Sequence, residues 1–309
     1  MPEGDRDWAE REYNPRVLVP DAARIYEGWP VRAAETRRRH PPITDIRYGE
    51  HPREVMDLFR AEKARGTVLF IHGGYWRAFS KEDFSWVADG FLRFGLSVAV
   101  LNYPLTPEVP LARIVDATRN AFATLYAEVL TPAERRRVVV TGHSAGGYLS
   151  ALHLATAWDD YGLPEDPLAG CVPISGVFSL APLIDTTMTD AIRRDLRQAG
   201  ELSLYVKPWR SRAPLTIFVG GDESAEFHRQ SEDLGGLERA RAEDPGYSRP
   251  QPFRRDRRAR RARLGAPQGD HGNDRPREMR ARPAQLGARP GEHPEQPRVR
   301  LEPGTRGQV

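Results

Sequence analysis

A serine flanked by glycines is the residue of this chain best suited to chemistry. Ser144 lies in Thr141-Gly142-His143-Ser144-Ala145-Gly146-Gly147, after the apolar run Val138-Val139-Val140 and before an apolar stretch of helical character. A serine hydroxyl becomes a useful nucleophile when a sharp turn exposes it beside a base and near backbone N–H groups. Glycines two positions before and after the serine let the chain make such a strand-to-helix turn. The pattern therefore predicts that Ser144 is a nucleophile.

A second glycine turn lies upstream and is expected to supply backbone N–H donors that face the nucleophile. His72-Gly73-Gly74-Tyr75-Trp76 follows the strand-like run 67–71. We expect the N–H groups of Gly73, Gly74 and Ala145 to form an oxyanion hole, in which one donor contributes about 3–4 kcal/mol of transition-state stabilisation. The alternative is two ordinary glycine turns in an α/β domain. The order of the motifs, each directly after a strand, favours the catalytic interpretation.

The elements that must position these turns alternate along the chain. Strand-like runs at 67–71, 96–102, 137–141, 170–174 and 214–219 are separated by helix-like segments near 82–94, 111–128, 146–158 and 225–234. A short strand is also expected around 43–48. This alternation predicts an α/β fold with a mostly parallel sheet flanked by helices, in which ligands bind beyond the carboxyl ends of the strands. The segment 178–210, with a helix expected over 185–198, is interpreted either as a cap over the site or as a surface excursion.

The composition changes after Leu234, so we divide the chain into a domain at 1–234 and a tail at 235–309. The tail has 18 arginines, no lysine, 10 acidic residues, 10 prolines and 10 glycines, and no apolar run of strand length. Such a sequence buries too little surface to offset an ordering entropy of about 1–2 kcal/mol per residue, and it is expected to be disordered. It also has the character of a GC-rich gene translated out of frame, a hypothesis that the nucleotide sequence tests.

Composition also excludes several classes of protein. One cysteine, Cys171, permits no intramolecular disulfide, and no Cys/His cluster has zinc-ligand spacing, so neither a metal nor another cofactor is expected. No apolar run approaches the roughly 20 residues of a membrane span, and a soluble, cytoplasmic protein with no membrane partner is the expectation. An arginine-rich tail can bind nucleic acid. The interspersed acidic residues and the two aromatics of the tail, Tyr247 and Phe253, argue against that interpretation.

Between Trp8 and Leu234 the sequence resembles the arylformamidase (kynurenine formamidase) branch of the α/β-hydrolases. The resemblance rests on the two glycine motifs and three further runs, namely Glu12-Tyr13-Asn14-Pro15-Arg16, Asn102-Tyr103-Pro104-Leu105 and Glu226-Phe227-His228-Arg229-Gln230-Ser231. It implies hydrolysis of N-formylkynurenine to kynurenine and formate in tryptophan catabolism, without a cofactor. Tyr75, Trp76 and Tyr103 are candidates to line a substrate pocket, and all three suit a core equally well. A homodimer is compatible with the sequence.

The resemblance also implies an acid after strand 214–219 and then a histidine. Asp222 and Glu223 are both candidates for the acid. Counting back from Glu226 favours Glu223, whereas the aspartate that the fold usually has after this strand favours Asp222. The last strand and helix of the fold are not recognisable in the sequence. Only His271 and His293 follow the acid beyond the next helix, and His271 is the better candidate for the base.

Three functions therefore remain open at the level of sequence. The first is a formamidase acting on N-formylkynurenine through Ser144, and the second is a general carboxylesterase. The third is a hydrolase scaffold impaired by the lack of a triad histidine. Loss of one triad member of this kind lowers turnover by about 10⁶-fold. Capture of the serine by an organophosphonate separates an activated serine from an impaired one.

Overall fold

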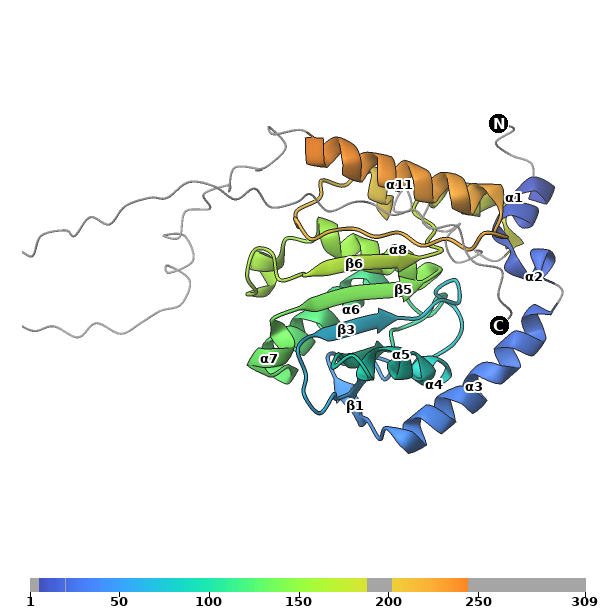
Figure 1. Cartoon of the computed structure of the whole chain (residues 1–309). Helices are drawn as coiled ribbons and strands as arrows, with labels where there is room; N and C mark the ends of the chain where they lie inside the picture. The colour runs from blue at the N-terminus through green and yellow to red at the C-terminus, as the bar shows by residue number, and fades with distance from the viewer. Residues whose placement is uncertain (1–5, 20, 188–201, 244–309) are drawn as a thin grey trace, which may run out of the picture. The chain divides into compact units, whose positions relative to one another are not determined.

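The computed structural model describes residues 6–19, 21–187 and 202–243, and its centre is a six-stranded sheet (Figure 1). The strands follow the order β1-β2-β4-β3-β5-β6. The central strand β3 is parallel to β4 and β5, and β5 is parallel to β6, whereas β2 is antiparallel to β1 and β4. The predicted α/β class with a mostly parallel sheet is confirmed. The strands are β1 (Ile43–Arg47), β2 (Val55–Phe59), β3 (Thr67–Ile71), β4 (Ser97–Leu101), β5 (Val138–His143) and β6 (Gly170–Ile174).

The central strands are apolar because both of their faces are covered. Every residue of β2, β3 and β4 is buried. Since successive side chains of a strand point to opposite faces, Phe70 packs in one apolar cluster with Val98 and Val100. Leu69 and Ile71 belong to a second, larger cluster. This continuous burial is typical of a parallel sheet between two helical layers.

The helices are more broken than the sequence predicted. They are α1 (Arg6–Tyr13), α2 (Pro15–Leu18), α3 (Ala22–Arg39), α4 (Lys81–Phe84), α5 (Ala88–Leu92), α6 (Leu111–Thr124), α7 (Pro132–Arg135), α8 (Ala145–Leu152) and α11 (Ala225–Glu243). The helix expected over 82–94 is α4 and α5 joined by a 3₁₀ turn at Ser85–Val87. The helix expected over 111–128 is α6 followed by a π-helical turn at Leu125–Val129. The third, expected over 146–158, ends at Leu152 and continues as the 3₁₀ turn His153–Ala155.

The segment predicted as a strand over 214–219 lies beside β6 but forms only two isolated parallel bridges, Cys171 with Leu215 and Ile174 with Phe218. Pro173 explains the interruption. The N–H groups of Thr216 and Phe218 donate to the carbonyls of Cys171 and Pro173, and Cys171 donates back to the carbonyl of Pro214. A proline at 173 has no N–H to donate in return, so the ladder lacks the bond that would join the two bridges.

The helix that follows this segment is longer than predicted. We expected a helix over 225–234 and disorder from residue 235, but α11 continues through Gly235 and Gly236 to Glu243. The sequence Leu-Glu-Arg-Ala-Arg-Ala-Glu after these glycines consists of strong helix formers, which offset two glycines that cost about 1 kcal/mol each. The rest of the tail and most of the helix expected over 185–198 lie outside the described residues, as do His271 and His293.

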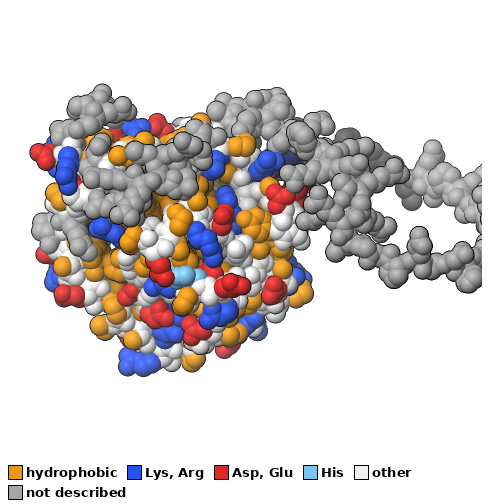
Figure 2. Space-filling view, turned by 180° about the vertical axis from the view of Figure 1, so that it is seen from behind, with side chains coloured by type: hydrophobic (Ala, Val, Ile, Leu, Met, Phe, Trp, Pro, Cys, Tyr) orange, Lys and Arg blue, Asp and Glu red, His pale blue; other side chains and the backbone are white. Residues whose placement is uncertain are grey.

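Neither the helices of the described part nor the face of it seen in Figure 2 suggests a membrane-spanning protein. None of its helices combines the length and the apolar character that crossing a bilayer requires. On the face shown in Figure 2, basic and acidic side chains are mixed with apolar ones rather than gathered by sign.

Candidate active site

Ser144 stands at a strained turn between β5 and α8. Its backbone has φ 55° and ψ −118°, in the positive-φ region that costs a non-glycine residue about 1–3 kcal/mol. The turn is held by the Ser144 N–H, which donates to the carbonyl of Ile174 at 2.9 Å. It also depends on a close approach, since a Cβ on Gly146 would lie 2.0 Å from the carbonyl oxygen of Ile71. The glycine spacing seen in the sequence therefore corresponds to a tight strand-to-helix turn that presents Ser144.

The turn after β3 lies directly against this serine. A Cβ on Gly73 would be 3.2 Å from the Cβ of Ser144, so the two backbones are nearly in contact. Gly74 has φ +107°, which a residue with a side chain rarely adopts. Ala145 is the first residue of α8, and the first N–H groups of a helix have no acceptor within the helix. The three proposed oxyanion donors therefore lie in the two turns that meet at Ser144.

The three aromatic side chains proposed for the pocket occupy different places. Tyr75 lines the cavity. Trp76 and Tyr103 are fully buried in the larger apolar cluster and are not among the lining residues. Tyr103 nevertheless supports the site, because its hydroxyl donates to the carbonyl of His72 at 2.9 Å and so holds the turn that carries Gly73.

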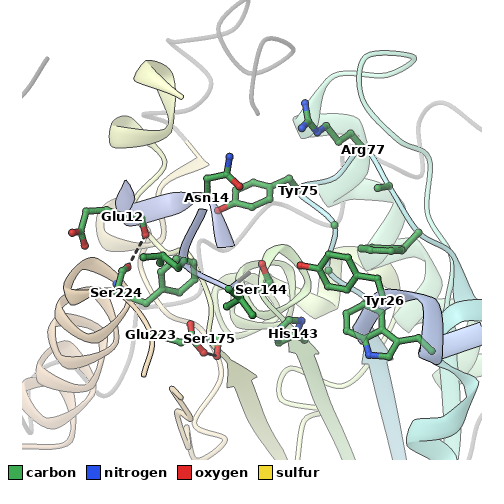
Figure 3. Close-up of a pocket in the computed structure, with 18 of the residues that line it drawn as sticks. Glu12, Asn14, Tyr26, Tyr75, Arg77, His143, Ser144, Ser175, Glu223 and Ser224 are labelled. Carbon is green, nitrogen blue, oxygen red and sulfur yellow. Dashed lines mark hydrogen bonds between the residues drawn. The ribbon is translucent and has the colours of Figure 1, made fainter. Parts of the chain in front are cut away.

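Both candidate acids lie on the loop after residue 219, and their surroundings differ. The Oε1 of Glu223 accepts hydrogen bonds from the Ser175 hydroxyl and from the N–H of Gly220, the latter at 3.1 Å. Asp222 also lines the cavity but is exposed. In the view of Figure 3, Glu223 and Ser175 lie together beside Ser144. A carboxylate fixed through one oxygen, with the other left for a histidine, is the arrangement that an acid of a catalytic triad requires.

Among the histidines of the described residues, only His143 lines the cavity. Burial lowers the pKa of its ring, and the neighbouring Glu223 carboxylate acts in the opposite direction. Burial also lowers the pKa of His72 and of His153 to about 4, and both rings are enclosed in the protein. His228 lies on α11, outside the cavity lining. The structure therefore brings Ser144, Glu223 and the glycine turns together, whereas His271 lies outside the described residues.

The cavity over Ser144 has a volume of about 460 Å³ (Figure 3). One wall is aromatic, with Trp29 packed against Tyr26, Phe79 and Phe84 at ring-centroid distances of 4.8, 5.4 and 4.9 Å. The residues that line the cavity are Glu12, Asn14, Leu18, Val19, Tyr26, Trp29, Gly73, Gly74, Tyr75, Arg77, Ala78, Phe79, Phe84, His143, Ser144, Ser175, Thr187, Asp222, Glu223, Ser224 and Phe227.

Several of these lining residues carry no local signal in the sequence. Tyr26 and Trp29 come from α3, in a polar region where they appear only as scattered aromatics. Glu12 and Asn14 belong to a run quoted for the family resemblance, which was a usable signal. Ser175 follows β6 without any local motif and has φ +50°, which only the structure reveals.

Comparison with known proteins agrees with this fold. A family model described as the alpha/beta hydrolase fold matches residues 68–240, and the chain belongs to this family. The match spans both glycine turns, the candidate acids and most of α11.

Individual relatives have sequence identities of 19 to 33% with this chain. The kynurenine formamidase of Danio rerio is 24% identical over 240 residues, which cover 73% of this chain and 79% of that protein. The crystal structure of a putative thioesterase from Silicibacter sp. tm1040 is 33% identical in sequence and matches with a TM-score of 0.66. The match covers 72% of this chain and 84% of that protein's chain. Esterase B from Lactobacillus rhamnosis matches with a TM-score of 0.53 at 19% identity, covering 71% of this chain and 80% of its own, and shares the fold.

Proposed function

We propose that this hydrolase cleaves the formamide of N-formylkynurenine, with Ser144 as the nucleophile and Glu223 as the acid of its triad. The observation that carries the proposal is the contact between the strained turn at Ser144 and the turn at Gly73. A serine that lines a cavity, with backbone donors beside it, is suited to acyl transfer. The aromatic wall formed with Trp29 fits an aryl substrate, and the kynurenine formamidase relatives support the choice of formamide.

The reaction follows from the placement of these groups. The Ser144 oxygen attacks the formyl carbon while its proton passes to an imidazole, and the carbonyl oxygen becomes an oxyanion held by the N–H groups of Gly73, Gly74 and Ala145. The C–N bond then breaks, and the imidazolium returns its proton to the departing aryl amine. Water attacks the formyl ester on Ser144 with the imidazole as base, which releases formate and restores the serine. We assign the imidazole to His271.

The test is hydrolysis of N-formylkynurenine by the full chain, alongside Ser144→Ala and His271→Ala. We expect both variants to lose turnover by up to about 10⁶-fold. A fluorophosphonate probe should label the original chain and leave Ser144→Ala unlabelled. Absence of labelling in the original, folded chain would contradict an activated serine and favour an impaired scaffold.

A second candidate is a carboxylesterase with a broader range of acyl groups. The cavity of about 460 Å³ is also lined by the apolar side chains of Leu18 and Val19, which suit an acyl chain longer than formyl. Comparison of p-nitrophenyl acetate and butyrate with N-formylkynurenine separates the two functions. A kcat/KM higher for butyrate than for the formamide would support the esterase.

A further inference from the structure

The end of α1 connects the two loops that face each other across Ser144. Tyr13 is the last residue of this helix and is 1% exposed. We infer that Tyr13 is a positioning residue, which ties the acid loop 222–224 to the oxyanion turn 73–76 and so sets the place of Glu223 relative to Ser144. The inference rests on the proposed function for its catalytic meaning.

The side chain of Tyr13 binds the helix that follows the acid. Its hydroxyl donates to Oε2 of Glu226 at 2.7 Å and accepts from Nε2 of Gln230 at 2.9 Å. Glu226 and Gln230 are four residues apart on α11 and therefore share one face of that helix. Both side chains are buried, so each polar group here needs its partner.

Glu12, one residue earlier, holds the start of the same helix. Its carbonyl accepts a hydrogen bond from the Ser224 hydroxyl at 2.6 Å, and its Oε2 accepts from the N–H of Glu226 at 3.1 Å (Figure 3). The N–H of Glu226, in the first turn of α11, thus finds an acceptor on α1 instead of on its own helix. Since Ser224 directly follows Glu223, these bonds act on the acid loop itself.

The backbone of Tyr13 binds the opposite loop. The hydroxyl of Tyr75 donates a hydrogen bond to the carbonyl of Tyr13. Tyr75 belongs to the oxyanion turn, directly after Gly74, and has φ 48°. One residue is therefore bonded through its side chain to α11 and through its carbonyl to the oxyanion turn.

Gln230 extends the connection to the third loop of the site. Its Oε1 accepts from the N–H groups of Phe178 and Ser179 at 2.7 and 2.9 Å. These residues follow Ser175, whose hydroxyl donates to Glu223. The amide of Gln230 thus links Tyr13 to the loop that supplies the acid with a hydrogen bond.

The protonation states of Tyr13 and Glu226 maintain the hydrogen bond between them. Burial, followed by the hydrogen bond to Glu226, raises the pKa of Tyr13 well above its usual range, so its hydroxyl keeps its proton to donate. The hydrogen bond from Arg229 is the largest cause that lowers the pKa of Glu226, and that carboxylate stays an acceptor. The same arrangement is compatible with α1 acting only as a structural support, and the experiment below separates the two.

The experiment compares Tyr13→Phe with Tyr48→Phe. Tyr48 is also buried, and its hydroxyl donates to the carbonyl of Asn102, so its replacement removes one buried hydrogen bond where Tyr13→Phe removes two. Amide hydrogen exchange is measured by mass spectrometry, with kcat and KM for p-nitrophenyl acetate. We expect Tyr13→Phe to speed exchange in peptides covering both 73–79 and 220–230 by about 10-fold relative to Tyr48→Phe. Its kcat should fall by about 10- to 100-fold while KM changes by less than about 3-fold.

Equal exchange of both peptides in the two variants would overturn the inference, and so would a change confined to one of the two loops. Ser224→Ala, which removes the bond to the Glu12 carbonyl and the longer bond at 3.5 Å from the Phe227 N–H, serves as the second variant if Tyr13→Phe does not fold. It should likewise speed exchange in both peptides, and a change confined to one of them would overturn the inference. Exchange needs no catalysis, so its result stands even if fluorophosphonate labelling of the original chain fails and the proposed function is wrong.

Discussion

Ser175 donates a hydrogen bond from its hydroxyl to Oε1 of Glu223, and the N–H of Gly220 donates to the same oxygen. The proposed acid, Glu223, is thereby held from the end of β6 and from its own loop. This pair distinguishes Glu223 from Asp222, which lines the same cavity but is exposed. The sequence left the choice between Asp222 and Glu223 open. The hydrogen bond from Ser175, 48 positions away in the chain, favours Glu223.

Neutralising the two carboxylates separately should identify the acid. We expect Glu223→Gln to lower kcat by about 10⁴-fold, because an amide cannot stabilise the imidazolium that forms during the reaction. Asp222→Asn should stay within about 3-fold of the original chain. Steady-state hydrolysis of N-formylkynurenine checks both, and the reverse order of effects would assign the role to Asp222.

Removing the Ser175 hydroxyl should weaken catalysis without weakening binding. In Ser175→Ala, Glu223 keeps the Gly220 N–H but loses its side-chain donor, so its position becomes less defined. We expect kcat to fall by about 10-fold with KM nearly unchanged. Ser175→Thr retains a hydroxyl and should recover part of the loss. A KM effect alone would mean that Ser175 contacts the substrate instead.

An added methyl group at the serine turn should destabilise the fold. In Gly146→Ala the new Cβ would meet the Ile71 carbonyl at 2.0 Å, a contact that the backbone can relieve only by moving β3 or α8. We expect the free energy of unfolding to fall by about 3 kcal/mol or more. Gly90→Ala is the matched control, because no atom lies within 4 Å of its new Cβ. It lies in α5 and should stabilise the protein by up to about 1 kcal/mol. Urea unfolding measures both, and equal midpoints would contradict the close approach.

Stability should fall on mild acidification because of two buried histidines. His72 and His153 have pKa values of about 4 in the folded protein, against an ordinary value of 6.5. Between these values the unfolded chain binds protons that the folded chain does not, so stability falls as pH decreases from 6.5 towards 4. Each histidine contributes about 1.4 kcal/mol per pH unit in that window.

Urea unfolding at pH 7 and at pH 5.5 measures this slope above the range in which most carboxylates titrate. His153→Gln removes one of these two groups and should reduce the slope by less than half, because burial also lowers the pKa of His143. A midpoint that does not change between these two pH values would exclude buried neutral histidines.

The elements that sequence could predict are those whose signal is local. The turns at Ser144 and Gly73 follow from glycine spacing after apolar strands, and β6 follows from a short apolar run, so the structure has both turns and the strand where we expected them. β2 was missed because it directly follows a polar loop and its Asp57 interrupts the apolar pattern. Helix α3 was missed because its sequence is polar and contains Pro30.

The rest of the site could not be predicted, because it depends on contacts between residues far apart in the chain. Tyr13 and Glu226 are separated by 213 positions, and no periodicity joins them. The same holds for Trp29, which reaches the cavity only because α3 packs against Phe84. For the base, only the chain order serine, acid, histidine points past the described residues, to His271 or His293, and the mutation of His271 is the decisive measurement.

The bond between Tyr13 and Glu226 has a consequence for the way the protein is synthesised. At about 5–20 residues per second, a ribosome needs on the order of 10–40 s to travel from one of these residues to the other. By the end of that interval the nascent chain carries both Ser144 and the turn at Gly73, while the hydroxyl of Tyr13 still lacks its partner Glu226. A translational pause just before Glu226 would prolong this incomplete state.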